Sequence, residues 1–160
     1  MMHVIDRHLD HGSSRNRPKR IVIHAMGHYI LHDGTFKAAA SFLDDVGLSA
    51  HALIAFGGEV IRCRHDTEGA WHAKGHNTDT LGVEFLVPGQ HDYTSFVRAM
   101  DTPGWLSAFA FAAGVELVRG WCEEFDIKAI VRHSDIDPTR KRDPGKGFPW
   151  DRFIEAVDRV

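Results

Sequence analysis

Short runs of apolar residues along the chain predict several β-strands. The first covers Ile21 to Ile23, directly after a charged loop, and two more lie at 51–56 and 60–64, on either side of Gly57-Gly58. A glycine pair between two such runs is typical of a β-hairpin turn. Two further runs predict strands at 80–87 and 128–132.

Other segments carry apolar residues at helical spacing, which predicts helices at 35–46, 105–125 and 149–160. Thr35 is the expected N-cap of the first helix and Gly47 its expected C-cap, while Thr102 with Pro103 is typical of a start signal for the second. Strands and helices that follow each other in this order predict an α/β fold, with helices on both faces of a sheet.

Length and composition favour one compact domain that covers residues 1–160. The chain has 160 residues, 43% of them hydrophobic and 26% charged, and a formal charge of -3. So small a charge does not favour nucleic acid as a partner. No apolar stretch reaches the roughly 20 residues that cross a bilayer, so we expect no membrane insertion. Within the domain, residues 1–18 form an N-terminal segment that we expect to be loosely ordered.

The chain is rich in histidine, with 12 residues of this type, and two of them stand where predicted strands end. His24 closes the first strand and His133 the last, and ligand sites commonly form at such strand ends. A catalytic zinc ion needs three protein ligands and one open position. The loop after His133 offers Asp135, Asp137 and Asp143, and we favour Asp143 because an Asp-Pro-Gly turn fixes it. On spacing alone, a structural role for these residues is an equal alternative.

Several ordered sequence blocks carry a resemblance to one enzyme family. The blocks are IVIH (21–24), SAHALIAFGGEV (49–60), AWHAKG (70–75), LGVEF (81–85) and HSDIDPTRKRDPGKGFPW (133–150). Together they resemble the type 2 N-acetylmuramoyl-L-alanine amidases, which include muropeptide-recycling amidases, phage lysozyme amidases and animal peptidoglycan recognition proteins. The resemblance implies a central mixed β-sheet flanked by helices, with a zinc site at the strand ends. It leaves residues 88–103 without a matching motif.

The family resemblance implies a complete catalytic site. Carried over by position, the zinc ligands fall on His24, His133 and Asp143, in agreement with the interpretation of the strand ends. The catalytic glutamate falls on Glu84 and the catalytic lysine on Lys141. A carboxylate within a mostly buried strand is costly unless it is paired or used, which favours a functional Glu84. The implied reaction is hydrolysis of the lactyl-L-alanine amide bond in peptidoglycan or muropeptides, with Glu84 handling the proton of water and Lys141 stabilising the oxyanion.

Three further residues are candidates for substrate binding under the same resemblance. Trp71 and His72 fall on the family's groove wall, where a ring could contact sugar or stem peptide. Asn77 could donate hydrogen bonds to the peptide or accept them from it. For all three, packing within the fold is an equal alternative.

Two rival functions remain at this stage. One is a peptidoglycan-binding module of the same fold without catalysis. This alternative is less favoured, because all three zinc ligands and both catalytic residues of the family can be placed on this sequence. The other is an unrelated hydrolase with Cys63 or Cys122 as nucleophile, although neither lies in a nucleophile motif. Because Met1 to Asp10 lacks the apolar core of a signal peptide, we expect a cytoplasmic protein, or one delivered to the cell wall by a holin or a secretion system.

Overall fold

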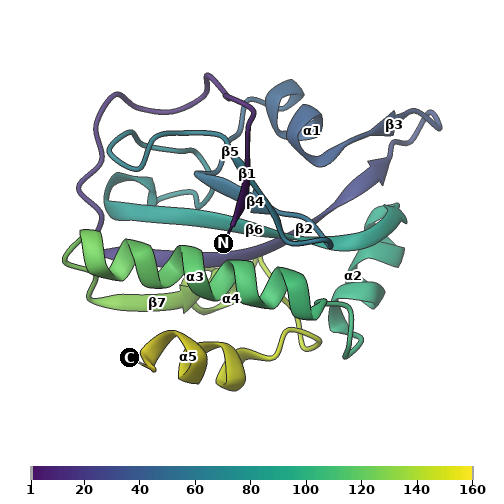
Figure 1. Cartoon of the computed structure of the whole chain (residues 1–160). Coiled ribbons are helices and arrows are strands. Elements are labelled where there is room, and N and C mark those ends of the chain that lie inside the picture. Colours follow the sequence, from purple (N-terminus) through teal and green to yellow (C-terminus); the bar gives the residue numbers. More distant parts are fainter. Residues whose placement is uncertain (1, 160) are drawn as a thin grey trace.

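A seven-stranded mixed sheet forms the centre of the protein, as the computed structural model describes it for residues 2–159 (Figure 1). Its order in space is β1-β5-β4-β6-β2-β3, and β7 also pairs with β2. The pairs β4–β5 and β2–β3 are antiparallel, whereas the other pairs are parallel. The strands are β1 (His3–Asp6), β2 (Arg20–Ile30), β3 (Phe36–Lys37), β4 (Ala52–Ile54), β5 (Glu59–Arg62), β6 (Thr80–His91) and β7 (Ala129–Arg132).

Helices cover both faces of the sheet, as the sequence predicts. Figure 1 shows α1 on one face and α3 with α5 on the opposite face. The larger apolar core lies between the sheet and α3 and α5, and a smaller core lies between the sheet and α1. The helices are α1 (Ala39–Asp45), α2 (Tyr93–Asp101), α3 (Ala108–Glu124), α4 (His133–Ile136) and α5 (Trp150–Asp158), with a 3-10 helix η1 at Asn77–Asp79.

Strand β6 separates apolar from functional positions by simple alternation. Leu81, Val83 and Phe85 belong to the larger core, beneath α3 and α5. Leu86 belongs to the smaller core on the other face, and Glu84 has the same parity in the strand. From Leu81 to Val87, one face of β6 is therefore apolar, while the other face carries the Glu84 carboxylate.

Strand β2 is longer than the sequence indicates. We expected it to close at His24, but it continues to Ile30, so that His24 lies in the middle of the strand. The expectation was wrong because β6, with 12 residues against 11 in β2, supplies main-chain partners as far as Tyr29, with a shift in register between Met26 and His28. Strand pairing, which depends on a distant segment, extended the strand past its polar residues.

The helix boundaries also differ from the predicted ones. The expected helical start at Thr35 is wrong, because Phe36–Lys37 pairs with β2 as strand β3, and α1 begins only at Ala39. Gly47, with a φ of +75°, follows the last helical turn, as expected of a helix-ending glycine.

The segment before α3 contains a helix that no sequence pattern predicted. Residues 88–103 include α2, whose N-cap Asp92 accepts a hydrogen bond from the main-chain N–H of Ser95 at 2.8 Å. Helix α3 then starts from Ser107, whose hydroxyl accepts a hydrogen bond from the N–H of Ala110, and not from the Thr102-Pro103 pair. Capping side chains decided both starts.

Residues 2–18 are integrated into the fold, in contrast to the loose order that we expected for residues 1–18, of which Met1 lies outside the described residues. Strand β1 pairs in parallel with β5, and Leu9 is completely buried. The side-chain amide of Asn16 donates to the carbonyl oxygen of Thr80 at 2.8 Å, which ties this segment to the start of β6. Within residues 2–159, the structure contains no helix long and apolar enough to cross a membrane.

Close packing of α3 on the sheet gives a stability prediction. A Cβ atom added at Gly114 would lie 2.5 Å from Cζ of the buried Phe85, so Gly114→Ala should destabilise the protein by about 1–3 kcal/mol. Gly120 lies on the same helix with nothing within 4 Å of such a Cβ, and Gly120→Ala should stabilise the protein by up to about 1 kcal/mol. Urea unfolding of both variants measures the difference, and equal stabilities would contradict the close approach.

Candidate metal centre

His24 and Glu84 are brought together by the pairing of β2 with β6. They are register partners on these adjacent parallel strands, and both are buried. His24 Nδ1 lies 3.7 Å from Glu84 Oε1. The two longest strands of the sheet therefore place an imidazole and a carboxylate side by side on the same face.

His133 and Asp143 reach the same place from the last strand and the loop that follows it. His133 is the first residue of α4 and comes directly after β7, which pairs with β2 up to Ile23. The loop then returns, and the N–H of Ser134 donates to the carbonyl oxygen of Asp143 at 3.0 Å. The loop therefore brings Asp143, the carboxylate favoured from the sequence, back beside the start of α4.

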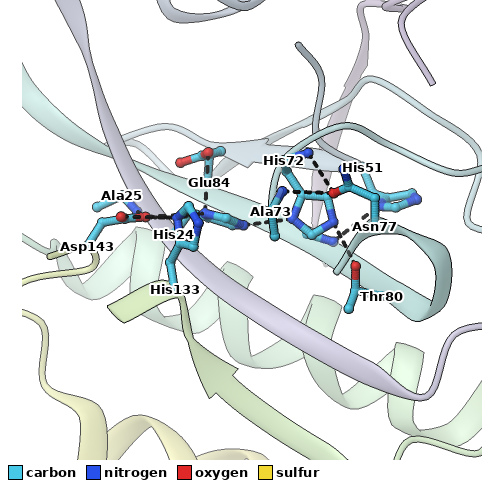
Figure 2. A network of polar contacts seen from close by, with 11 residues as sticks. His24, Ala25, His51, His72, Ala73, Asn77, Thr80, Glu84, His133 and Asp143 are labelled. Atoms are coloured by element: carbon cyan, nitrogen blue, oxygen red, sulfur yellow. Dashed lines mark hydrogen bonds and ion pairs between the residues drawn. The ribbon is translucent and has the colours of Figure 1, made fainter. Parts of the chain in front are cut away.

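Three side chains converge with their electron-pair donors facing one another (Figure 2). His24 Nδ1 lies 2.9 Å from His133 Nδ1, and each of these nitrogens lies 3.2 Å from Asp143 Oδ2. Tetrahedral zinc holds nitrogen and oxygen ligands at about 2.0–2.1 Å, which separates neighbouring ligand atoms by roughly 3.3 Å. The separations fit a zinc ion bound by all three residues, with one ligand position left for water or substrate.

The protonation states of these groups also suit a cation. Burial lowers the pKa of His24 to about 4, so the imidazole is neutral near pH 7. Burial alone would raise the pKa of Asp143, but the nearby imidazoles of His133 and His24, whose Nδ1 atoms each lie 3.2 Å from Oδ2, hold it well below its usual range. A neutral imidazole and an ionised carboxylate are the forms that bind a metal without first losing a proton.

Glu84 has the environment of a proton-transfer group. Burial, followed by repulsion from Asp143, raises its pKa well above the usual value. Its Oε2 is buried and has no hydrogen-bond partner among the described residues. An unpaired carboxylate oxygen in such a place is costly, and it is free to take a proton from a water molecule beside the metal position.

A pocket surrounds this cluster and contains the predicted lysine. Lys141 lines it together with His24, Glu84 and Asp143. The loop that carries Lys141 is tied to α2, because the Arg142 guanidinium donates to Asp101 at 2.9 Å. The structure therefore brings the five residues predicted for metal binding and catalysis to one pocket.

The three predicted substrate binders occupy different environments. Trp71 lines the pocket and is 44% exposed, so its indole is accessible to a ligand. His72 also lines the pocket, but each ring nitrogen already contacts a side chain, His24 on one side and Thr80 on the other. Asn77 is not among the pocket residues, and its Oδ1 accepts main-chain hydrogen bonds from His72 and Ala73. Substrate contact by these three residues stays a prediction.

Sequence reasoning missed two residues that shape the site. Tyr93, at the start of the unpredicted helix α2, lines the pocket and is 70% exposed. Gly82 leaves the space that the His72 ring fills, since a Cβ there would lie 2.5 Å from His72 Nδ1. A glycine inside a buried strand is a recognisable signal of close approach, whereas nothing in the sequence marked Tyr93.

Neither cysteine takes part in this pocket. Cys63 is buried, and burial raises the pKa of its thiol to about 12, which makes it a poor nucleophile near neutral pH. Cys122 is exposed on α3 and does not line the pocket. The geometry gives the cysteine hydrolase no support.

Comparisons with known proteins point to one family. The model of the N-acetylmuramoyl-L-alanine amidase family matches residues 14–146. N-acetylmuramoyl-L-alanine amidase A from Achromobacter lyticus is 25% identical, over 93% of this chain and 88% of its own length. The 1,6-anhydro-N-acetylmuramyl-L-alanine amidase AmpD from Escherichia coli is 30% identical, over 70% of this chain and 60% of its own. In fold, the amidase LysC from Clostridium intestinale matches over 100% of both chains, with a TM-score of 0.71 and 15% identity.

The geometry of the metal centre predicts that zinc binding needs the carboxylate of Asp143 but not that of Asp137. The purified chain should hold about one zinc ion, and Asp143→Ala should lose most of it because one of three ligands is removed. Asp137→Ala is the matched control, since this loop carboxylate instead pairs with Arg140 at 2.7 Å. Metal content measured by mass spectrometry after dialysis tests both variants. Zinc retained by Asp143→Ala, or lost equally from the control, would contradict the ligand set.

Proposed function

The chain belongs to the N-acetylmuramoyl-L-alanine amidase family, and from this membership we propose that it is a zinc-dependent amidase of peptidoglycan or muropeptides. The bond hydrolysed is the amide between the lactyl group of N-acetylmuramic acid and L-alanine. The observation that carries the proposal is the convergence of His24, His133 and Asp143 next to Glu84, whose free oxygen faces no protein partner within residues 2–159. We further infer that residues 1–160 work as one amidase domain.

The mechanism divides the work between a metal and the chain's own side chains. Zinc held by His24, His133 and Asp143 would supply Lewis acidity, which acidifies a water molecule and polarises the scissile carbonyl. Glu84 takes the proton of the attacking water, since its raised pKa brings it closer to neutral pH than an ordinary carboxylate. The same carboxyl group then delivers a proton to the amine of L-alanine as the C–N bond breaks.

Lys141 has a separate task in this mechanism. Its position on the pocket wall, with Glu84 and Asp143 as fellow lining residues, places a cation within the site. The carbonyl oxygen of the substrate gains negative charge as water attacks, and a cation beside it lowers the energy of the transition state. Trp71, exposed on the same wall, offers an aromatic face to the sugar or the stem peptide.

A peptidoglycan-binding module without catalysis is the alternative within the same fold. It requires no general base, whereas this chain buries Glu84 beside the metal position with Oε2 unpaired among residues 2–159, at a cost that binding alone does not explain. The complete ligand set likewise favours an enzyme over a module. Product analysis separates the two functions directly.

The proposed bond specificity predicts the products. Digested sacculi should show new N-termini of L-alanine and no new reducing sugar ends. Chromatography of the digest after labelling of amino groups detects the former, and a reducing-end assay the latter. New reducing ends would instead indicate a glycosidase, while binding without release of any product would favour the recognition module. Soluble 1,6-anhydro-muropeptides assayed in parallel distinguish a recycling enzyme from a lysin.

Substitutions of Glu84 and Lys141 test catalysis separately from metal binding. Glu84→Gln keeps the shape of the side chain but cannot accept the proton, so turnover should fall by about 10² to 10⁴. Lys141→Ala should lose about 10² to 10³ by analogy with an oxyanion partner. Both variants should retain zinc and still bind muropeptide, because neither residue is a proposed ligand.

A lysine in the same loop provides the control for Lys141. Lys146 is exposed and does not line the pocket, so Lys146→Ala should keep wild-type turnover. Initial rates with zinc content measured on the same samples decide the outcome. Near wild-type turnover in Glu84→Gln or Lys141→Ala at full zinc occupancy would remove that residue from the mechanism.

A further inference from the structure

His72 connects the metal centre to the start of β6 through both of its ring nitrogens. His72 Nδ1 lies 2.8 Å from His24 Nε2, on the side of the His24 ring that faces away from the metal position. His72 Nε2 lies 3.0 Å from the hydroxyl oxygen of Thr80. Figure 2 shows these side chains in a row that leads from Thr80 through His72 to His24.

The direction of each hydrogen bond in this row follows from the Thr80 hydroxyl. Thr80 has one hydroxyl hydrogen, and it donates to the carbonyl oxygen of His76 at 2.8 Å. Toward the ring, the Thr80 oxygen must therefore accept, so His72 carries its proton on Nε2. If Thr80 instead donated its hydrogen to His72, the Thr80 hydroxyl oxygen and the His76 carbonyl oxygen would lie 2.8 Å apart with no hydrogen between them.

The hydrogen bond to His72 also determines which ring nitrogen of His24 carries the proton. A neutral His72 with its proton on Nε2 has a lone pair on Nδ1, which can only accept. His24 must then donate from Nε2, and its Nδ1 is left with a lone pair. This Nδ1 is the atom that lies between His133 and Asp143, where the metal ligands converge.

The fold holds the His72 ring in place on two sides. The side-chain oxygen of Asn77 accepts hydrogen bonds from the N–H groups of His72, at 3.1 Å, and Ala73, at 2.8 Å, which fixes the main chain. Gly82 leaves room for the ring, because a Cβ at this position would lie 2.5 Å from His72 Nδ1. The other histidine ligand has no such support, since His133 Nε2 is buried without a partner in the described part of the chain.

We infer that His72, oriented by Thr80, is a positioning residue that holds the metal ligand His24 in the Nε2–H tautomer with Nδ1 free to bind zinc. The inference rests on the proposed zinc centre. It gives His72 a structural task within the site in place of direct substrate contact. Partners of this kind around metal ligands typically change metal affinity by 10- to 100-fold when they are removed.

Two substitutions of His72 separate hydrogen bonding from packing. His72→Leu fills the space but removes the acceptor, so zinc affinity should fall by about 10- to 100-fold. His72→Asn retains an acceptor oxygen near the place of Nδ1 and should recover most of that affinity. Zinc titration against a competing chelator measures both, with thermal unfolding of the metal-free chains as a check on the fold.

A spectroscopic measurement tests the tautomer without metal or substrate. Nitrogen-15 NMR of the metal-free wild-type chain should show His24 protonated on Nε2. Thr80→Val removes the acceptor for His72 and should weaken this preference and zinc binding together, whereas Thr80→Ser keeps the hydroxyl and should preserve both. This pair also tests the inference if His72→Leu fails to fold.

The outcomes distinguish this inference from the proposed function. Wild-type zinc affinity in a folded His72→Leu chain, or His24 protonated on Nδ1 in the wild type, would overturn the role of His72 and leave the amidase proposal standing. Failure of the wild-type chain to bind zinc at all would overturn the metal centre, and this inference with it.

Discussion

The parallel pairing of β2 with β6 sets His24 beside Glu84, and the rest of the site is arranged around these two buried side chains. Polar groups that are withdrawn from water are stable only when they are paired or used, so the position of each creates a demand for partners. His133 begins α4 directly after the last strand, Asp143 lies in the loop that follows α4, and His72 lies in the segment before β6. Segments far apart in the sequence therefore depend on one strand register.

The sheet can accommodate buried polar side chains on one face because its other face packs an apolar core. On the α3 side, Ile21, Ile23, Leu81, Val83 and Phe85 are completely buried. Burial of each such side chain contributes about 1.5–3 kcal/mol, whereas an unsatisfied buried polar group costs about 1–3 kcal/mol. A few apolar residues are enough to offset the unpaired oxygen of Glu84. The apolar face thus stabilises the strands whose opposite face bears His24 and Glu84.

Features with a local pattern could be predicted from the sequence, and features that depend on a distant partner could not. Apolar runs predicted the buried strands, and a carboxylate within one of them indicated a functional Glu84. The loop from His133 back to Asp143 was expected from its Asp-Pro-Gly turn. The continuation of β2 past His24 was not, because it depends on the length of β6. The contact between His72 and Thr80 joins residues at no diagnostic spacing.

We propose that His24, His133 and Asp143 together hold a catalytic zinc ion, and a crystal structure with anomalous diffraction recorded on both sides of the zinc absorption edge shows whether they do. We expect one anomalous peak at about 2.0–2.1 Å from Nδ1 of both histidines and from a carboxylate oxygen of Asp143. A zinc-replete crystal with no peak among these three residues, or with zinc bound by other histidines, would contradict it.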